Sequence, residues 1–186
     1  MTLEDVEESI KAEFPGFKIV PKSGSRLMRA IDIALRIITF NQMKRFMESF
    51  VTTIGTTVYV PVTWYAPYHG SVKMSDVSKI IILRHERVHM GQKKLYGSFL
   101  FSLAYLFLPF PVVFALCRTR FEKQGYEESM RATAELVGIE SLDNPLYRRH
   151  MIRHFISAEY FWMWPFRKSI ERWYDSTVAE IRANHL

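Results

Sequence analysis

The sequence predicts an α+β domain that is mostly helical and contains one small β element. Most of the chain carries apolar residues at helical spacing, whereas β-branched and aromatic residues concentrate in one stretch, residues 51–65. The apolar content of 48% and the charged content of 24% are ordinary for a folded protein, and 186 residues suffice for one domain with a core. No repeat or linker divides the chain, so we expect a single domain over residues 1–186.

The first half of the chain is expected to alternate helices with short strands. An amphipathic helix at 3–14 has Thr2 as its N-cap and ends before Pro15-Gly16. Residues 51–65 predict two strands or a hairpin around Gly55, and Pro61, which lacks an N–H donor, indicates an edge. Such an edge strand can bind an extended peptide, although a purely structural hairpin fits equally well. The other predicted elements are a strand at 17–20, a helix at 26–39 capped by Ser25 and buried on more than one side, a short helix at 43–50, and a loop at 65–77.

The second half is expected to be helical. Predicted helices cover 79–96, 118–138, about 145–162 after Asn144-Pro145, and 167–183. Residues 98–117 carry no charge and are long enough to span a bilayer, but Pro109 and Pro111 break them near the middle. This break favours a buried core segment, with contact to a membrane or a larger assembly as the alternative.

Composition limits the kinds of binding partner, metal site and cellular location that the sequence predicts. The net charge is +6, but the basic residues are scattered, which argues against a specific nucleic-acid site. Cys117 is the single cysteine, so neither a disulfide framework nor a cysteine metal cluster is expected. The acidic first residues lack the apolar core of a signal peptide, so we expect a cytoplasmic or virion-associated protein. The oligomeric state cannot be predicted.

The helix at 79–96 contains the sequence His85-Glu86-Arg87-Val88-His89, an HExxH motif. On a helix, His85 and His89 lie one turn apart on the same face, where their imidazoles can converge on one metal ion. Two imidazoles suit Zn²⁺, and Glu86 can act as general base on a zinc-bound water. The histidine face is otherwise mostly apolar, as expected for a site that faces the core.

A catalytic zinc needs a third protein ligand, and no further histidine follows at short spacing. The helix at 118–138 offers four glutamates. The face around Glu122 carries small residues that permit close approach of a neighbouring helix, whereas the face around Glu127 is rich in charge. Glu122 is therefore the favoured ligand. The alternatives are Glu127, Glu128 and Glu135.

The HExxH motif followed by Glu122 on a later helix resembles the gluzincins, the zinc metallopeptidases with a glutamate ligand. The segments HERVHMGQ and RTRFEKQGY are more closely similar to small, mostly uncharacterised HExxH proteins of bacteria and phages, which share Gln92 and the element Glu122-Lys123-Gln124-Gly125-Tyr126. The resemblance covers roughly residues 51–130. It implies a minimal zincin-like fold, Zn²⁺ bound by His85, His89 and Glu122, and hydrolysis of a peptide or protein substrate.

The chain departs from the gluzincin pattern at Tyr126, where thermolysin-like enzymes carry an aspartate that orients the first histidine. Tyr126 can fill this orienting role. It can instead steady the oxyanion of the transition state, a role for which His154 and Tyr160 are equal candidates. The pair His150 and His154 repeats the histidine spacing, but its arginine neighbours favour a basic helix face over a metal site.

Two other classes of protein remain compatible with the sequence. In one, the HExxH zinc only stabilises the fold, and chelation would unfold the protein. In the other, the chain is a structural or interaction protein, such as a component of a phage particle, with a vestigial site.

Overall fold

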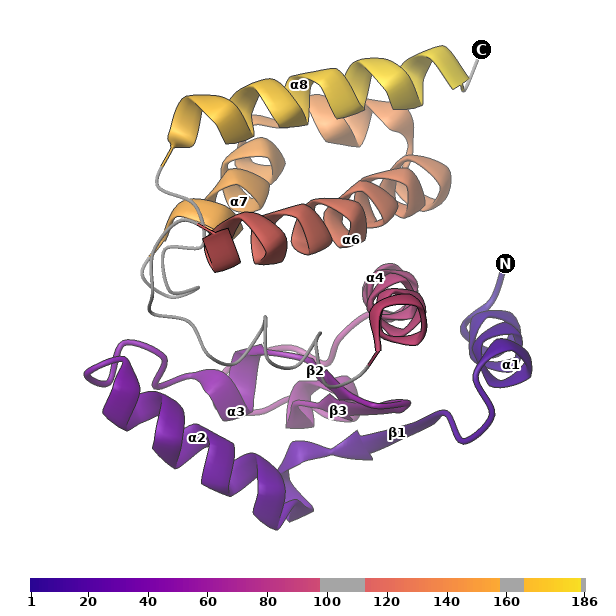
Figure 1. Cartoon of the computed structure of the whole chain (residues 1–186). Helices are drawn as coiled ribbons and strands as arrows, with labels where there is room; N and C mark the ends of the chain where they lie inside the picture. The colour runs from indigo at the N-terminus through magenta and orange to yellow at the C-terminus, as the bar shows by residue number, and fades with distance from the viewer. Residues whose placement is uncertain (98–112, 158–165, 185–186) are drawn as a thin grey trace. The chain divides into compact units, whose positions relative to one another are not determined.

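The computed structural model describes residues 1–97, 113–157 and 166–184, apart from the side chains of 113–117. It is a mostly helical α+β structure with one three-stranded mixed sheet, which confirms the predicted fold class. Two compact units divide it, Met1–Met90 and Gly91–Leu186. Figure 1 shows the elements of each unit.

The N-terminal unit begins with two capped helices. Helix α1 (Leu3–Glu13) starts in a capping box, in which the Thr2 hydroxyl accepts from the Asp5 N–H and the Asp5 carboxylate accepts from the Thr2 N–H. Helix α2 (Arg26–Ile38) has Ser25 as its N-cap, bonded to the Met28 N–H. Both caps were predicted from the sequence. A short 3₁₀ turn, η1 (Lys22–Gly24), precedes α2, and α3 (Phe46–Ser49) follows it.

The sheet has the strand order β1-β3-β2. Strands β2 (Thr52–Ile54) and β3 (Thr57–Val60) form the predicted hairpin, and Gly55 takes the positive φ of 61° that a two-residue hairpin turn requires. Strand β1 (Lys18–Pro21) pairs with β3 in parallel, from Lys18 opposite Thr57 to Pro21 opposite Val60. Strand β3 is therefore central, and the edge predicted from Pro61 is wrong. Pro61 lies after the last paired residue, where its missing donor costs no ladder hydrogen bond.

Helix α4 (Asp76–Tyr96) follows η2 (Val62–Trp64) and carries the HExxH motif. Ser75 caps it by accepting from the Ser78 N–H. Leu83 and Met90, on the side away from the histidines, are buried, so α4 is covered on more than one face. The core of the N-terminal unit includes Val6, Ile10, Phe14, Phe17, Met28, Phe46, Val58, Val60, Trp64, Ile80 and Leu83.

The C-terminal unit is built from three helices that pack on one another (Figure 1). They are α6 (Val113–Val137), α7 (Pro145–Ile156) and α8 (Arg167–Asn184), with the 3₁₀ turn η3 (Ile139–Asp143) between α6 and α7. Asn144 caps α7 and Pro145 is its first residue, as predicted. The helix ends at Ile156, earlier than expected. The core consists of Met130, Ala134, Leu142, Met151, Tyr174, Val178 and Ile181, with Ile152, Phe155 and Ile170 in a second cluster.

Two sequence predictions concern membranes and burial. Within the described residues, none of the helices has the length and apolar character needed to cross a membrane, and residues 98–112 of the uncharged run lie outside the described part. The predicted burial of α2 on more than one side is wrong. Met28 is its one fully buried residue, whereas Ile33 and Ile37 are 60% and 71% exposed.

Candidate metal centre

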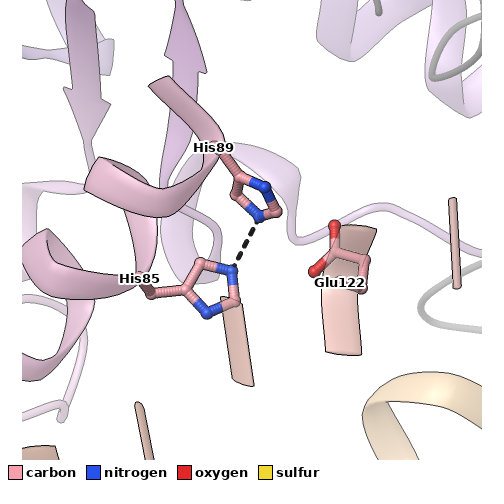
Figure 2. A group of neighbouring side chains, drawn as sticks. All are labelled: His85, His89 and Glu122. Carbon is pink, nitrogen blue, oxygen red and sulfur yellow. Dashed lines mark hydrogen bonds between the residues drawn. The ribbon is translucent and has the colours of Figure 1, made fainter. Parts of the chain in front are cut away.

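The two histidines of the HExxH motif point at each other from successive turns of α4 (Figure 2). Their Nε2 atoms lie 2.9 Å apart, and the ring planes meet at 76°. His89 is only 5% exposed and His85 is half-buried. The two rings are hydrogen-bonded to each other in this structure, and both turn the same nitrogen toward one point, as two imidazole ligands of a single ion do.

The carboxylate of Glu122, on α6, joins this pair (Figure 2). One ligand atom from each of His85, His89 and Glu122 can be chosen so that all lie within 4.8 Å of one another. Glu122 is buried, with 7% of its surface exposed. Two imidazoles and one carboxylate form the donor set of His₂Glu zinc sites, so the residues fit this metal. This is the one such group that was found among the described residues.

Gln92 connects the next turn of α4 to the segment of α6 around Glu122. Its amide Nε2 donates to the Phe121 carbonyl over 3.2 Å and to the Gln124 side-chain oxygen over 2.7 Å. One turn further on, the Tyr96 ring packs on the Phe121 ring at 5.3 Å. These contacts join the last turns of α4 to the residue before Glu122 and to the residue two positions after it. Gln92 thus bonds to α6 through both a backbone and a side-chain oxygen.

Glu86 is buried beside the histidines and is 8% exposed. Its carboxylate accepts no hydrogen bond from any residue that the structure describes. Hydrogen bonds to the described residues therefore do not occupy its oxygens, and the nearby Lys22 partly offsets the desolvation of its charge.

Lys22 is a buried lysine whose protonated form interacts with Glu86, and no sequence pattern singles it out. Its side chain is 1% exposed, and Nζ donates to the Phe46 carbonyl over 3.0 Å while lying 3.5 Å from the centroid of the Phe46 ring. Burial lowers the pKa of Lys22 to about 7, and the negative charges of Glu86 and Asp32 oppose the shift. Lysines are seldom buried, so the burial of Lys22 is unexpected from its sequence.

We expect the protein to become more stable as the pH rises from 7 to 9, because of Lys22. In the unfolded chain a lysine keeps its proton up to a pKa of about 10.4, whereas folded Lys22 loses it near 7. The unfolded state binds more protons over this range, so the free energy of unfolding rises with pH, by about 2 kcal/mol for this group. Urea unfolding at both pH values measures the slope. Lys22→Met should remove it, and Lys18→Met, at an exposed position of β1, should keep it. An unchanged slope in Lys22→Met would contradict the assignment.

The other glutamates of α6 have different surroundings. Glu127 accepts a hydrogen bond from the Trp173 indole over 2.8 Å. Glu128 is half-buried and Glu135 is exposed, and neither belongs to the metal-binding group. Of the four glutamates that the sequence offers as a third ligand, Glu122 lies with His85 and His89. Glu127, Glu128 and Glu135 do not belong to the group.

Tyr126 and His154 lie against each other, with ring centroids 5.0 Å apart. His154 is 9% exposed, and its Nδ1 bonds to the His150 carbonyl over 2.8 Å. A carbonyl only accepts, so Nδ1 carries the hydrogen of this bond. The roles of Tyr126 and His154 in catalysis stay predictions, and Tyr160 lies outside the described residues. Burial lowers the pKa of His150, helped by the charge of Arg153, which is consistent with a basic helix face.

Comparison with known proteins found no matching family model, no matching curated protein and no matching solved structure.

Proposed function

We propose that this chain is a zinc-dependent peptidase whose metal is held by His85, His89 and Glu122. The observation that carries the proposal is the convergence of these three side chains, from two helices, next to the buried glutamate of the HExxH motif. Zinc, when bound, would polarise the peptide carbonyl and make water acidic enough to attack near neutral pH. The resemblance of the HExxH motif and Glu122 to the gluzincins also supports a peptidase.

Each residue of the site has a part in this function. Glu86 takes a proton from the attacking water and delivers it to the amine that leaves, as a general base and then a general acid. Gln92 holds the α6 segment around Glu122 in register with the histidines through its bonds to Phe121 and Gln124. Lys22, in its protonated form, interacts electrostatically with Glu86.

A second candidate is a zinc site that only stabilises the fold. The low exposure of His89 and Glu122, 5% and 7%, favours it, because structural zinc sites are closed to solvent. The two candidates differ in what chelation does. A structural zinc holds the fold together, so its removal would unfold the chain, whereas a catalytic zinc can leave a folded protein behind.

The test is peptide hydrolysis by the purified chain with one equivalent of zinc. A mixture of unstructured peptides is incubated with the protein, and products are identified by mass spectrometry. We expect cleavage that stops on chelation with 1,10-phenanthroline and returns when zinc is restored, while circular dichroism shows that helicity is retained. Zinc binding without cleavage, with loss of helicity on chelation, would favour the structural candidate and overturn the peptidase.

A further inference from the structure

Helix α2 presents an apolar surface that no described residue covers. On a helical projection, Met28 marks the buried side, and the opposite side carries Ala30, Ala34 and four large residues in an arc that Arg26, the first residue of the helix, interrupts. The large residues are Leu27, Ile33, Ile37 and Ile38, with exposures of 49%, 60%, 71% and 56%. We call these four residues and the two alanines the α2 arc. Ordinary surfaces carry single exposed apolar residues, whereas contiguous ones mark a contact site.

The chain after α2 extends the apolar surface. Phe40 is 90% exposed, and Phe40 and Asn41 both adopt positive φ values, 50° and 64°, which turn the backbone at the end of the helix. The Asn41 N–H bonds back to the Arg36 carbonyl over 2.7 Å, so the turn is held to the helix. Phe40 therefore adds one more exposed apolar side chain directly after the helix.

The charges around the α2 arc are basic. Arg26, Arg29 and Arg36 are exposed on α2, and Lys44 and Arg45 are exposed soon after it. The acidic residue in this stretch is Asp32, which pairs with Arg36 over 2.9 Å. Arg29 and Arg36 lie on the flank between the arc and the buried side. An exposed apolar stripe beside arginines is the pattern of a helix that lies in the surface of a membrane with negatively charged lipids.

We propose that α2 and Phe40 bind the surface of an anionic lipid bilayer, with the arc among the acyl chains and the arginines at the headgroups. Helix α2 has 13 residues, too few to span a bilayer, so it would lie in the plane of the surface. Charge favours lipid over a second copy of the chain. Two arcs facing each other would bring their arginines together, whereas anionic headgroups neutralise them.

Vesicle sedimentation tests the proposal with the full chain. Binding is compared on phosphatidylcholine vesicles with and without 30% phosphatidylglycerol, at low and at physiological salt. We expect at least tenfold tighter binding to the anionic vesicles. Ile33→Asp/Ile37→Asp should weaken this binding at least tenfold, and Arg26→Gln/Arg29→Gln should weaken it mainly at low salt. Leu146→Asp, an equally exposed apolar position on α7 at 69%, is the matched control and should bind like the wild type.

Three outcomes would overturn the proposal. The first is a wild-type chain that does not bind anionic vesicles. The second is equal binding by Ile33→Asp/Ile37→Asp, which would assign the contact to another part of the chain. The third is a wild-type dimer that becomes monomeric in this variant by analytical ultracentrifugation, which would make a second copy the occupant. All substituted side chains are exposed, so circular dichroism should show the wild-type fold in each variant. The result does not depend on peptidase activity.

Discussion

Replacement of Glu86 by glutamine is expected to leave zinc bound and to lower kcat/KM for a cleaved peptide by roughly 10²- to 10⁴-fold, the range that general acid–base catalysis supplies. Glutamine has the shape of glutamate, but its amide cannot take a proton from water. Glu86 is 8% exposed and accepts no hydrogen bond from the described residues, so the substitution breaks no such contact. Zinc content by elemental analysis and hydrolysis of the peptide are measured on the same preparation.

Glu140→Gln is the matched control, because it makes the same change at an exposed glutamate of η3. We expect this variant to keep both zinc and activity. A Glu86→Gln protein that retains turnover within tenfold of the wild type would rule out Glu86 as the base. Loss of zinc together with activity would instead point to a role of Glu86 in binding the metal.

Replacement of His89 or Glu122 by alanine is expected to weaken zinc binding by on the order of a hundredfold or more. Zinc sites with four protein ligands bind with roughly 10–16 kcal/mol, so one ligand accounts for about 3 kcal/mol, or about a hundredfold in Kd. Competition with a chromophoric chelator measures the affinity. The ligand atoms of both residues lie within 4.8 Å of a ligand atom of His85, so each substitution removes one of the three candidate metal ligands.

The control for the carboxylate ligand is Glu128→Ala, at a half-buried glutamate of the same helix. It should bind zinc like the wild type. Weak binding in Glu128→Ala with normal binding in Glu122→Ala would transfer the third ligand to Glu128. Undiminished binding in all of these variants would mean that the metal lies elsewhere in the chain.

The metal-binding group could be predicted because helical geometry is local. His85 and His89 are one turn apart in any helix, and the small residues on the face of Glu122 indicated which carboxylate points inward. Ser129 and Thr133, two of these residues, are indeed buried. The pattern of one helix therefore determined the orientation of its own side chains.

Features that depend on distant parts of the chain could not be predicted. Strand β3 is central because β1 pairs with it in parallel. The residues near Pro61 do not indicate that a distant strand pairs there. Helix α2 is as apolar as a buried helix, but its sequence does not say which elements pack on it. Lys22 looks like any loop lysine until the structure places it over the Phe46 ring. In each case the missing information was the identity of a tertiary neighbour.

The mixed sheet also determines the order in which the N-terminal unit can fold. The hairpin of β2 and β3 closes a two-residue turn, and such hairpins form within microseconds. The β1–β3 pairing joins segments separated by α2 and α3, so it carries the entropy cost of a much longer loop. The first strand of the chain is therefore the last to join the sheet. Lys22 directly follows β1, so its side chain becomes buried only in this late step. The interaction of Lys22 with Glu86 therefore forms after the local structure of the unit.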